Sequence, residues 1–249
     1  MDFSNKHFFI TGASSGIGKA LAIYLSERGA RLTITGRNLE RLAQTLESLT
    51  GEGHISIVSD LSNVEDIDAM FKTAIDRQGV LDGCVHCAGL QKTLPLQSVS
   101  SEAYDDLFNV NVKSALFIAK SFRRKGVANP VGASLVFLSS VAALAGEPAI
   151  SIYSASKGAL ISLARSLAVE LARQKIRVNC IAPGVVDTDM ADGLKAKLSD
   201  DQYNIILKKH PLGLGTVNDV SSGVAFLLSD GARWVTGTTL VMDGGYTAG

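Results

Sequence analysis

The sequence alternates short β-rich runs with longer stretches of helical periodicity along most of its length. The β-rich runs cover residues 7–11, 31–35, 55–59, 81–87, 134–138, 177–181 and 239–242. Helical patterns cover residues 16–28, 39–49, 64–78, 101–124 and 153–173. Parallel strands need long crossovers, and helices usually supply them. With right-handed crossovers, the alternation predicts an α/β fold in which helices flank a doubly wound parallel sheet of about seven strands.

We expect one Rossmann-type domain over residues 1–249, because no linker or low-complexity tract divides the chain. One excursion, at about residues 188–212, interrupts the alternation and has roughly helical apolar spacing. It is interpreted as a substrate lid or, alternatively, as an insertion that only packs on the core. Its apolar positions are Met190, Leu194, Leu198, Tyr203, Ile206 and Leu207.

Charge and cysteine content argue against several classes of protein. Lys plus Arg equals Asp plus Glu at 24 each, which argues against nucleic-acid and polybasic membrane-surface binding. No apolar run approaches the ~20 residues of a membrane span. We interpret Cys84, Cys87 and Cys180 as buried thiols of a cytoplasmic protein. Cys84-x-x-Cys87 has redox-motif spacing, but no helix N-terminus follows to activate a thiolate.

The first β-rich run leads into Gly12, Gly16 and Gly18, which open a helical stretch. Glycines permit a tight turn and close backbone approach, and a helix N-terminus offers free N–H groups to a pyrophosphate. The alternative is a βα turn without a ligand. A strand before the glycines and a helix after them favour a nucleotide site.

The second run ends in Thr35-Gly36-Arg37-Asn38, where an NAD site usually places a carboxylate. The Arg37 guanidinium would instead meet a 2′-phosphate, and Ser14 could add a hydroxyl donor. NADP(H) is therefore favoured over NAD(H), although Arg37 is alternatively an ordinary surface residue at a helix start. Asp60 would either accept from the adenine amino group or cap the following turn.

Tyr153 and Lys157 stand four residues apart, on one face of the helix expected there. A phenol titrates near 10, and a neighbouring ammonium group lowers that pKa. The pair is a candidate acid/base device. Taken alone, the pair is weak evidence, because this spacing more often marks an ordinary surface face of a helix.

Taken in order, these motifs resemble the short-chain dehydrogenase/reductase family over essentially all 249 residues. The chain is most similar to the 3-oxoacyl-carrier-protein reductase and tetrameric carbonyl reductase branches, of which the tail at 235–245 is typical. One departure is His86-Cys87 where the family commonly has Asn-Asn. This removes amides that tie neighbouring strands, and we interpret His86 as a packed substitute rather than a catalytic group. The matching motifs are residues 11–18, Asn111, Ser140, Tyr153-x-x-x-Lys157 and Pro183-Gly184.

The resemblance implies roles for four catalytic residues. Tyr153 would be the acid in reduction and the base in oxidation, and Lys157 would lower its pKa and hold the nicotinamide ribose. Ser140, rather than Ser139, would hydrogen-bond the substrate oxygen. Asn111 would bend its helix and hold a water linked to Lys157. The implied cofactor-binding residues are Gly12, Ser14, Ser15, Gly16, Ile17, Gly18, Arg37, Asp60, Leu61, Ala88, Gly89, Tyr153, Lys157, Pro183, Gly184, Val186 and Thr188; no metal is implied.

The implied activity is hydride transfer between NADP(H) and a carbonyl or secondary alcohol, as in a 3-oxoacyl ketoreductase. The alternatives are a sugar or secondary-alcohol dehydrogenase working oxidatively and a non-catalytic nucleotide-binding regulator. The substrate would be a small molecule or acyl thioester, and a carrier protein would need a basic patch near the cleft. The resemblance also implies a homotetramer, with Ala159, Leu160, Leu163, Leu167 and Leu171 in an interface or only in the core. Candidates for the basic patch are Arg124, Lys125, Arg173 and Lys175.

Overall fold

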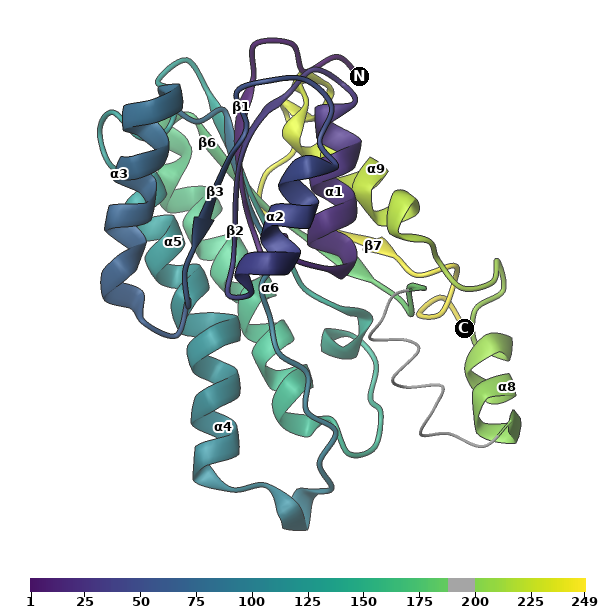
Figure 1. Ribbon diagram of the computed structural model, residues 1–249. Coiled ribbons are helices and arrows are strands. Elements are labelled where there is room, and N and C mark those ends of the chain that lie inside the picture. Colours follow the sequence, from purple (N-terminus) through teal and green to yellow (C-terminus); the bar gives the residue numbers. More distant parts are fainter. Residues whose placement is uncertain (188–199) are drawn as a thin grey trace.

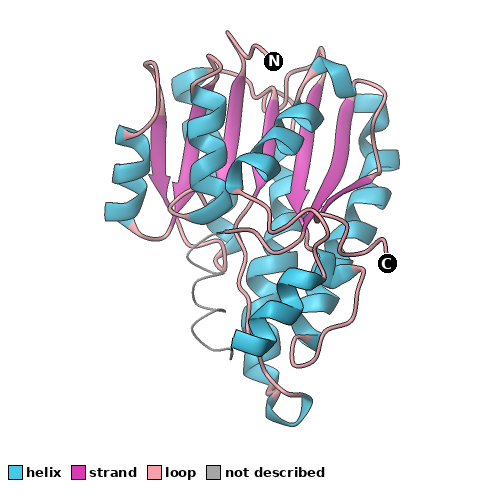
Figure 2. Ribbon diagram, turned by 90° about the vertical axis from the view of Figure 1, so that its right-hand side faces the viewer, coloured by secondary structure: helices cyan, strands magenta, loops and turns pink. Residues whose placement is uncertain are grey.

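The computed structural model describes residues 1–187 and 200–249, with side chains described up to Asp187 and from Tyr203 onward. Seven parallel strands form one sheet in the order β3-β2-β1-β4-β5-β6-β7, which confirms the predicted doubly wound sheet (Figure 2). The strands are β1 (His7–Thr11), β2 (Arg31–Gly36), β3 (Ile55–Val58), β4 (Gly83–His86), β5 (Ala133–Leu138), β6 (Ile176–Pro183) and β7 (Thr239–Met242).

Helices cover both faces of the sheet, and each face has its own apolar core (Figure 1). Successive strand residues point to opposite faces, so Phe9 joins one core while Phe8 and Ile10 join the other. This two-sided burial explains why the strands read as continuous apolar runs. The core around Phe9 is covered by α3 (Ile67–Gln78), α5 (Ser114–Phe122) and α6 (Ser151–Leu171). The core around Phe8 is covered by α1 (Gly16–Ser26), α2 (Leu39–Glu47) and α9 (Val217–Leu228).

The single helix expected over residues 101–124 is divided into three parts. It consists of α4 (Ser101–Phe108), a π-helical segment (Asn109–Lys113) and α5. The helix distortion expected at Asn111 is therefore confirmed. A π turn inserts an extra residue into the helical repeat and often occurs at functional sites.

The sequence analysis did not predict α9. Its start carries a capping box, in which the Thr216 side chain and the Asp219 carboxylate each bond the other's backbone N–H. The helical spacing expected within 188–212 corresponds in part to α8 (Asp200–Lys208). Short 3₁₀ turns complete the chain at Val64–Asp66, Leu96–Ser98, Val141–Ala143, Ala172–Gln174 and Asp230–Ala232.

The long helix α6 contributes mainly to the chain's own core. Leu160, Leu167 and Leu171 are buried within the chain, so these three residues belong to its core rather than to an interface. Leu163 is half-buried, while Val169 on the same helix is 81% exposed. Among the described residues, no helix is long and apolar enough to cross a membrane.

Candidate nucleotide-binding and active site

A cleft of about 640 Å³ lies along the carboxyl ends of β1, β2, β3 and β4. The chain adds β2 and β3 on one side of β1, and then β4 to β7 on its other side. The order of the strands therefore reverses between β1 and β4, and open α/β sheets bind ligands at such a switch point. The cleft gathers most of the predicted nucleotide residues into one site. Its lining includes Gly12, Ser14, Ser15, Gly16, Ile17, Gly18, Arg37, Asp60, Leu61, Ala88 and Gly89.

The glycine loop has a geometry that other residues would not accept. Gly12 adopts φ +68°, and a Cβ there would lie 2.6 Å from the Ala88 nitrogen. A Cβ on Gly18 would collide with the Gly12 carbonyl oxygen. The Ser15 side chain does not cap α1, and the first turn of α1 has no acidic residue. This helix start therefore keeps its positive dipole end for an anion, which fits the pyrophosphate of a dinucleotide.

Two arginines stand where β2 meets α2. Arg37 and Arg41 are both exposed and both line the cleft. Neither forms an ion pair with a carboxylate among the described residues. Arg41 is not among the residues predicted from the sequence, although its place one helical turn after Arg37 was a usable signal. Two guanidinium groups therefore stand beside the carboxyl end of β2, and a guanidinium can bind an anion such as a phosphate.

Asp60 caps the turn after β3, as one of its two interpretations expected. Its carboxylate accepts from the Ser62 backbone N–H at 2.9 Å. That hydrogen bond is the main cause that lowers the pKa of Asp60, and the charge of Arg37 contributes further. Because Asp60 also lines the cleft, its contact with adenine stays a prediction.

The end of β5 places two adjacent serines in different surroundings. Ser139 is buried, and its hydroxyl donates to the Lys157 carbonyl at 2.9 Å. The Ser140 hydroxyl accepts from the Ala142 N–H at 3.2 Å and lies close enough to Tyr153 to lower the pKa of its phenol. The structure therefore brings Ser140 to Tyr153, whereas Ser139 joins β5 to α6.

Lys157 is 4% exposed, and its Nζ donates to the Leu138 carbonyl at 2.8 Å. Burial lowers the pKa of Lys157 to about 8. Burial raises the pKa of Tyr153, and the nearby Ser140 hydroxyl only partly opposes this. The net shift of the Tyr153 pKa is therefore upward, opposite to the direction expected from its lysine neighbour. The ammonium lies 5.7 Å from the tyrosine ring centroid, and the phenol's loss of hydration dominates.

Asn111 is fully buried within the π-helical segment. Its Oδ1 accepts from the Leu90 N–H at 2.7 Å, and its Nδ2 donates to the Leu90 carbonyl and the Ser156 hydroxyl, each at 2.9 Å. The amide thus joins the loop after β4 to α6. The proposed water-holding role of Asn111 stays a prediction.

His86 ties together three segments at the floor of the site. Its Nδ1 lies 2.9 Å from the Thr11 hydroxyl, and its Nε2 lies 3.1 Å from the Ser114 hydroxyl. The Ser114 hydroxyl uses its only hydrogen to donate to the Val110 carbonyl, so it must accept from His86 Nε2–H. Burial lowers the pKa of His86 to about 3, so the ring is neutral and Nδ1 accepts from Thr11.

The resulting hydrogen bonds run in one direction from β4 to the start of α5. The Ala88 N–H donates to Thr11 Oγ1 at 3.2 Å, Thr11 donates to His86, and His86 donates to Ser114. The amides lost with Asn-Asn are therefore replaced here by the bonds of the His86 ring. The imidazole links β1 and β4 to the first residue of α5, in agreement with its interpretation as a packed substitute.

We expect His86→Leu to lower the free energy of unfolding by about 2 kcal/mol, because two buried hydroxyls each lose one hydrogen bond. His86→Asn should lose about half as much, since the shorter amide reaches only one of them. Chemical denaturation of the three proteins measures the difference. If the free energy of unfolding of His86→Leu lies within about 0.5 kcal/mol of the parent's, the two hydrogen bonds of His86 do not stabilise the fold as proposed.

The loop after β6 completes the described part of the site. The Gly184 N–H donates to the Met242 carbonyl at 2.9 Å, and a Cβ on Gly184 would lie 2.9 Å from Asp243 Cα. This loop is therefore packed against the C-terminal tail. Pro183 ends β6 and Val186 is buried, but their contacts with nicotinamide stay predictions. Thr188 lies outside the described residues.

The cysteines are free, and burial keeps them protonated. Cys84 and Cys180 are buried and Cys87 is half-buried. Burial raises the pKa of Cys87 and of Cys180 to about 12 and also raises that of Cys84. A thiol needs a lowered pKa to act in redox exchange, so the structure gives no support to a redox pair. No group of three or more metal-ligating side chains forms among the described residues.

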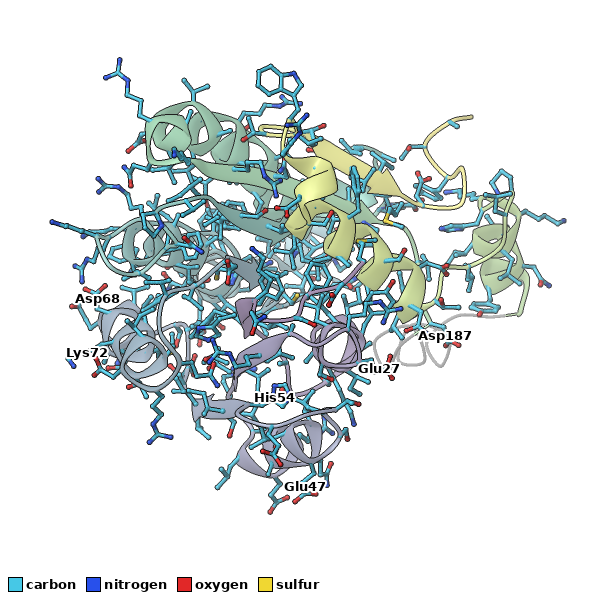
Figure 3. All side chains as sticks on the ribbon, turned by 90° about the horizontal axis from the view of Figure 1, so that it is seen from above. Glu27, Glu47, His54, Asp68, Lys72 and Asp187 are labelled. Carbon is cyan, nitrogen blue, oxygen red and sulfur yellow. The ribbon has the colours of Figure 1, made fainter. Side chains whose placement is uncertain are left out.

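The basic residues considered for carrier docking lie away from the cleft within one chain. Arg124 follows the end of α5 and pairs with Asp68 of α3 at 2.7 Å; Figure 3 shows Asp68 on the outer side of that helix. Arg173 and Lys175 follow α6 and precede β6, at the amino edge of the sheet. The expectation of a patch at the cleft entrance is wrong for the single chain, because crossover helices end opposite the strands' carboxyl edge.

The parallel sheet, the glycine loop and the cleft at the switch point define a Rossmann-type dinucleotide-binding protein. A family model described as enoyl-(acyl carrier protein) reductase matches residues 12–247. The chain belongs to the short-chain dehydrogenase/reductase family and is therefore an oxidoreductase that uses a nicotinamide cofactor.

Three similar proteins illustrate this relationship. A relative named (2S)-[(R)-hydroxy(phenyl)methyl]succinyl-CoA dehydrogenase subunit BbsD, from Thauera aromatica, is 34% identical over 248 residues and covers 98% of each chain. The 3-oxoacyl-[acyl-carrier-protein] reductase FabG of Rickettsia conorii is 34% identical over 246 residues, again covering 98% of each. A solved glucose/ribitol dehydrogenase-type structure from Brucella melitensis is 32% identical, has a TM-score of 0.91 and covers 99% of each chain.

Proposed function

We propose that the protein transfers hydride between NADP(H) and the 3-oxo or 3-hydroxy group of an acyl thioester. The observation that carries the proposal is the grouping of three side chains: Ser140 lies close enough to Tyr153 to affect its pKa, and the buried Lys157 ammonium lies 5.7 Å from the Tyr153 ring centroid. Two similar proteins are named for acyl groups on coenzyme A or on a carrier protein, which supports a thioester substrate. Arg37 and Arg41 on the cleft wall support NADP(H) over NAD(H).

The bound cofactor supplies or accepts the hydride at its nicotinamide ring. Ser140 orients the substrate oxygen and accepts or donates one hydrogen bond with Tyr153. Tyr153 gives its Oη proton to the developing alkoxide during reduction and takes it back during oxidation. Lys157 stands beside the phenol, where a positive charge stabilises the phenolate left after proton transfer. Its lowered pKa, about 8, places its own titration near physiological pH.

The remaining predictions extend this proposal to the whole chain. Residues 1–249 form one domain. The lid role expected of residues 188–212 stays a prediction, because residues 188–199 lie outside those that the structure describes. Leu116 on α5 and Val169 on α6 are 46% and 81% exposed, which supports helix-to-helix contacts in a homotetramer. Three free thiols support a reducing, cytoplasmic location.

A second candidate is a sugar or secondary-alcohol dehydrogenase that works oxidatively. The name of the Brucella melitensis structure favours it. A non-catalytic nucleotide-binding regulator is a more distant alternative, because Tyr153, Lys157 and Ser140 are all present and adjacent in the site.

Cofactor absorbance during turnover distinguishes these functions. We expect NADPH oxidation with acetoacetyl-CoA to exceed that with 2,3-butanedione at least tenfold, and NADP⁺ reduction by ribitol or sorbitol to be minor. Turnover confined to the sugar alcohols would select the second candidate. Tight NADPH binding without turnover of any of these substrates would favour the regulator.

A further inference from the structure

Three segments far apart in the sequence meet beside the end of α8. Glu147 lies in the loop between Ser140 and Tyr153, Lys209 and His210 follow α8, and Tyr246 belongs to the C-terminal tail. Glu147 Oε1 accepts from Lys209 Nζ at 2.6 Å and from the Tyr246 hydroxyl. Figure 1 shows the C-terminus next to α8. One carboxylate therefore receives hydrogen bonds from two segments that are far apart in the sequence.

His210 extends this cluster to the loop after β6. It is 3% exposed, and its ring centroid lies 5.0 Å from that of Tyr246. Its Nδ1 lies 2.8 Å from the Ile206 carbonyl, while its Nε2 accepts from the Val185 N–H at 3.3 Å. A carbonyl only accepts and an amide N–H only donates, so His210 is the neutral Nδ1–H tautomer here. The imidazole thus joins the last turn of α8 to Val185 in the loop after β6.

Two backbone hydrogen bonds hold the segments of this cluster together. The Leu94 N–H donates to the Ala149 carbonyl at 2.6 Å, which joins the loop after β4 to the loop that carries Glu147. The Leu212 N–H donates to the Gly244 carbonyl at 3.0 Å, which joins the segment after α8 to the tail. The cluster therefore connects α8 and the tail to loops that flank Tyr153.

We propose that Glu147, His210 and Tyr246 are positioning residues that hold α8 and the C-terminal tail against the loops of Ser140 and Val185, and so shape the substrate end of the cleft. The proposal rests on the proposed function of that cleft. None of the three residues lines the nucleotide cleft. Their loss should therefore weaken substrate binding while leaving the affinity for NADPH unchanged.

Tyr246→Phe is the sharpest test, because it keeps the ring beside His210 and removes only the hydroxyl bonded to Glu147. We expect the KM for acetoacetyl-CoA to rise about tenfold, the loss of one charge-assisted hydrogen bond. The kcat should stay within about twofold of the parent's, and the Kd for NADPH should not change. Hydrogen exchange of the α8 peptide, measured with NADPH present, should become about tenfold faster.

Two further variants make the result specific. Glu147→Gln keeps an acceptor for Tyr246 but loses the charge that pairs with Lys209, so we expect a smaller rise in KM. Tyr24→Phe is the matched control, since the Tyr24 ring lies on α1 with Arg28 3.4 Å above its centroid. This control should leave the KM and the exchange of α8 unchanged.

Failure of the positioning role and failure of the proposed activity would give different results. Parental KM and parental α8 exchange in both Tyr246→Phe and Glu147→Gln would overturn the positioning role. A rise in KM accompanied by equally large falls in kcat and in the affinity for NADPH would also overturn the positioning role, since such changes indicate general destabilisation. If the parent protein does not turn over acetoacetyl-CoA, the proposed function fails. The exchange of α8 still decides the positioning role in that case, because it needs no substrate.

Discussion

Tyr153→Phe is expected to lower kcat for acetoacetyl-CoA reduction by about 10³-fold, within the range of general acid catalysis. The variant loses only the hydroxyl that supplies the proton, while the ring continues to fill its place in the site. None of the described residues offers a second phenol or carboxyl bonded to Ser140. The Kd for NADPH, measured by fluorescence titration, should stay within a few-fold of the parent's.

The adjacent serines provide a matched pair of controls. Ser140→Ala removes the hydroxyl that lies beside Tyr153 and should lower kcat by about 10²-fold, comparable to the loss of one stabilising donor. Ser139→Ala removes a buried bond to the Lys157 carbonyl. It should act mainly on stability, by about 1 kcal/mol. Near-parental kcat in Tyr153→Phe would remove the assignment of the proton donor.

Arg37→Asp is expected to shift the preference for NADPH over NADH by about 100-fold toward NADH, or ~2.7 kcal/mol. The substitution removes a guanidinium that suits a phosphate and places a carboxylate where a ribose 2′-hydroxyl can donate to it. Separate Kd values for the two cofactors measure the effect. The Kd for NADPH should rise and the Kd for NADH should fall.

Two other arginines test whether the effect is local. Arg41→Asp changes the second guanidinium on the cleft wall and should shift the preference in the same direction. Arg173→Asp makes the same change of charge at the opposite edge of the sheet and should leave the preference unchanged. Unchanged selectivity in both Arg37→Asp and Arg41→Asp would mean that another residue recognises the 2′ position.

Burial and long-range contacts account for what sequence reasoning missed. The capping box that begins α9 was visible at Thr216 and Asp219, but its pattern was not interpreted as a helix. The direction of the Tyr153 pKa shift was wrong, because spacing shows which charge is near but not how strongly the phenol is desolvated. Spacing also did not show which edge of the sheet Arg173 reaches.

The sequence alone determined the strand positions, the parallel sheet, the glycine loop and the pairing of Tyr153 with Lys157. These features depend on local periodicity and on residue types a few positions apart. Only the tertiary structure decided that His86 links Thr11 to Ser114, and that Glu147 joins Lys209 to Tyr246. Such hydrogen bonds join side chains up to 99 residues apart, so they exist only after the sheet has brought its loops to one edge.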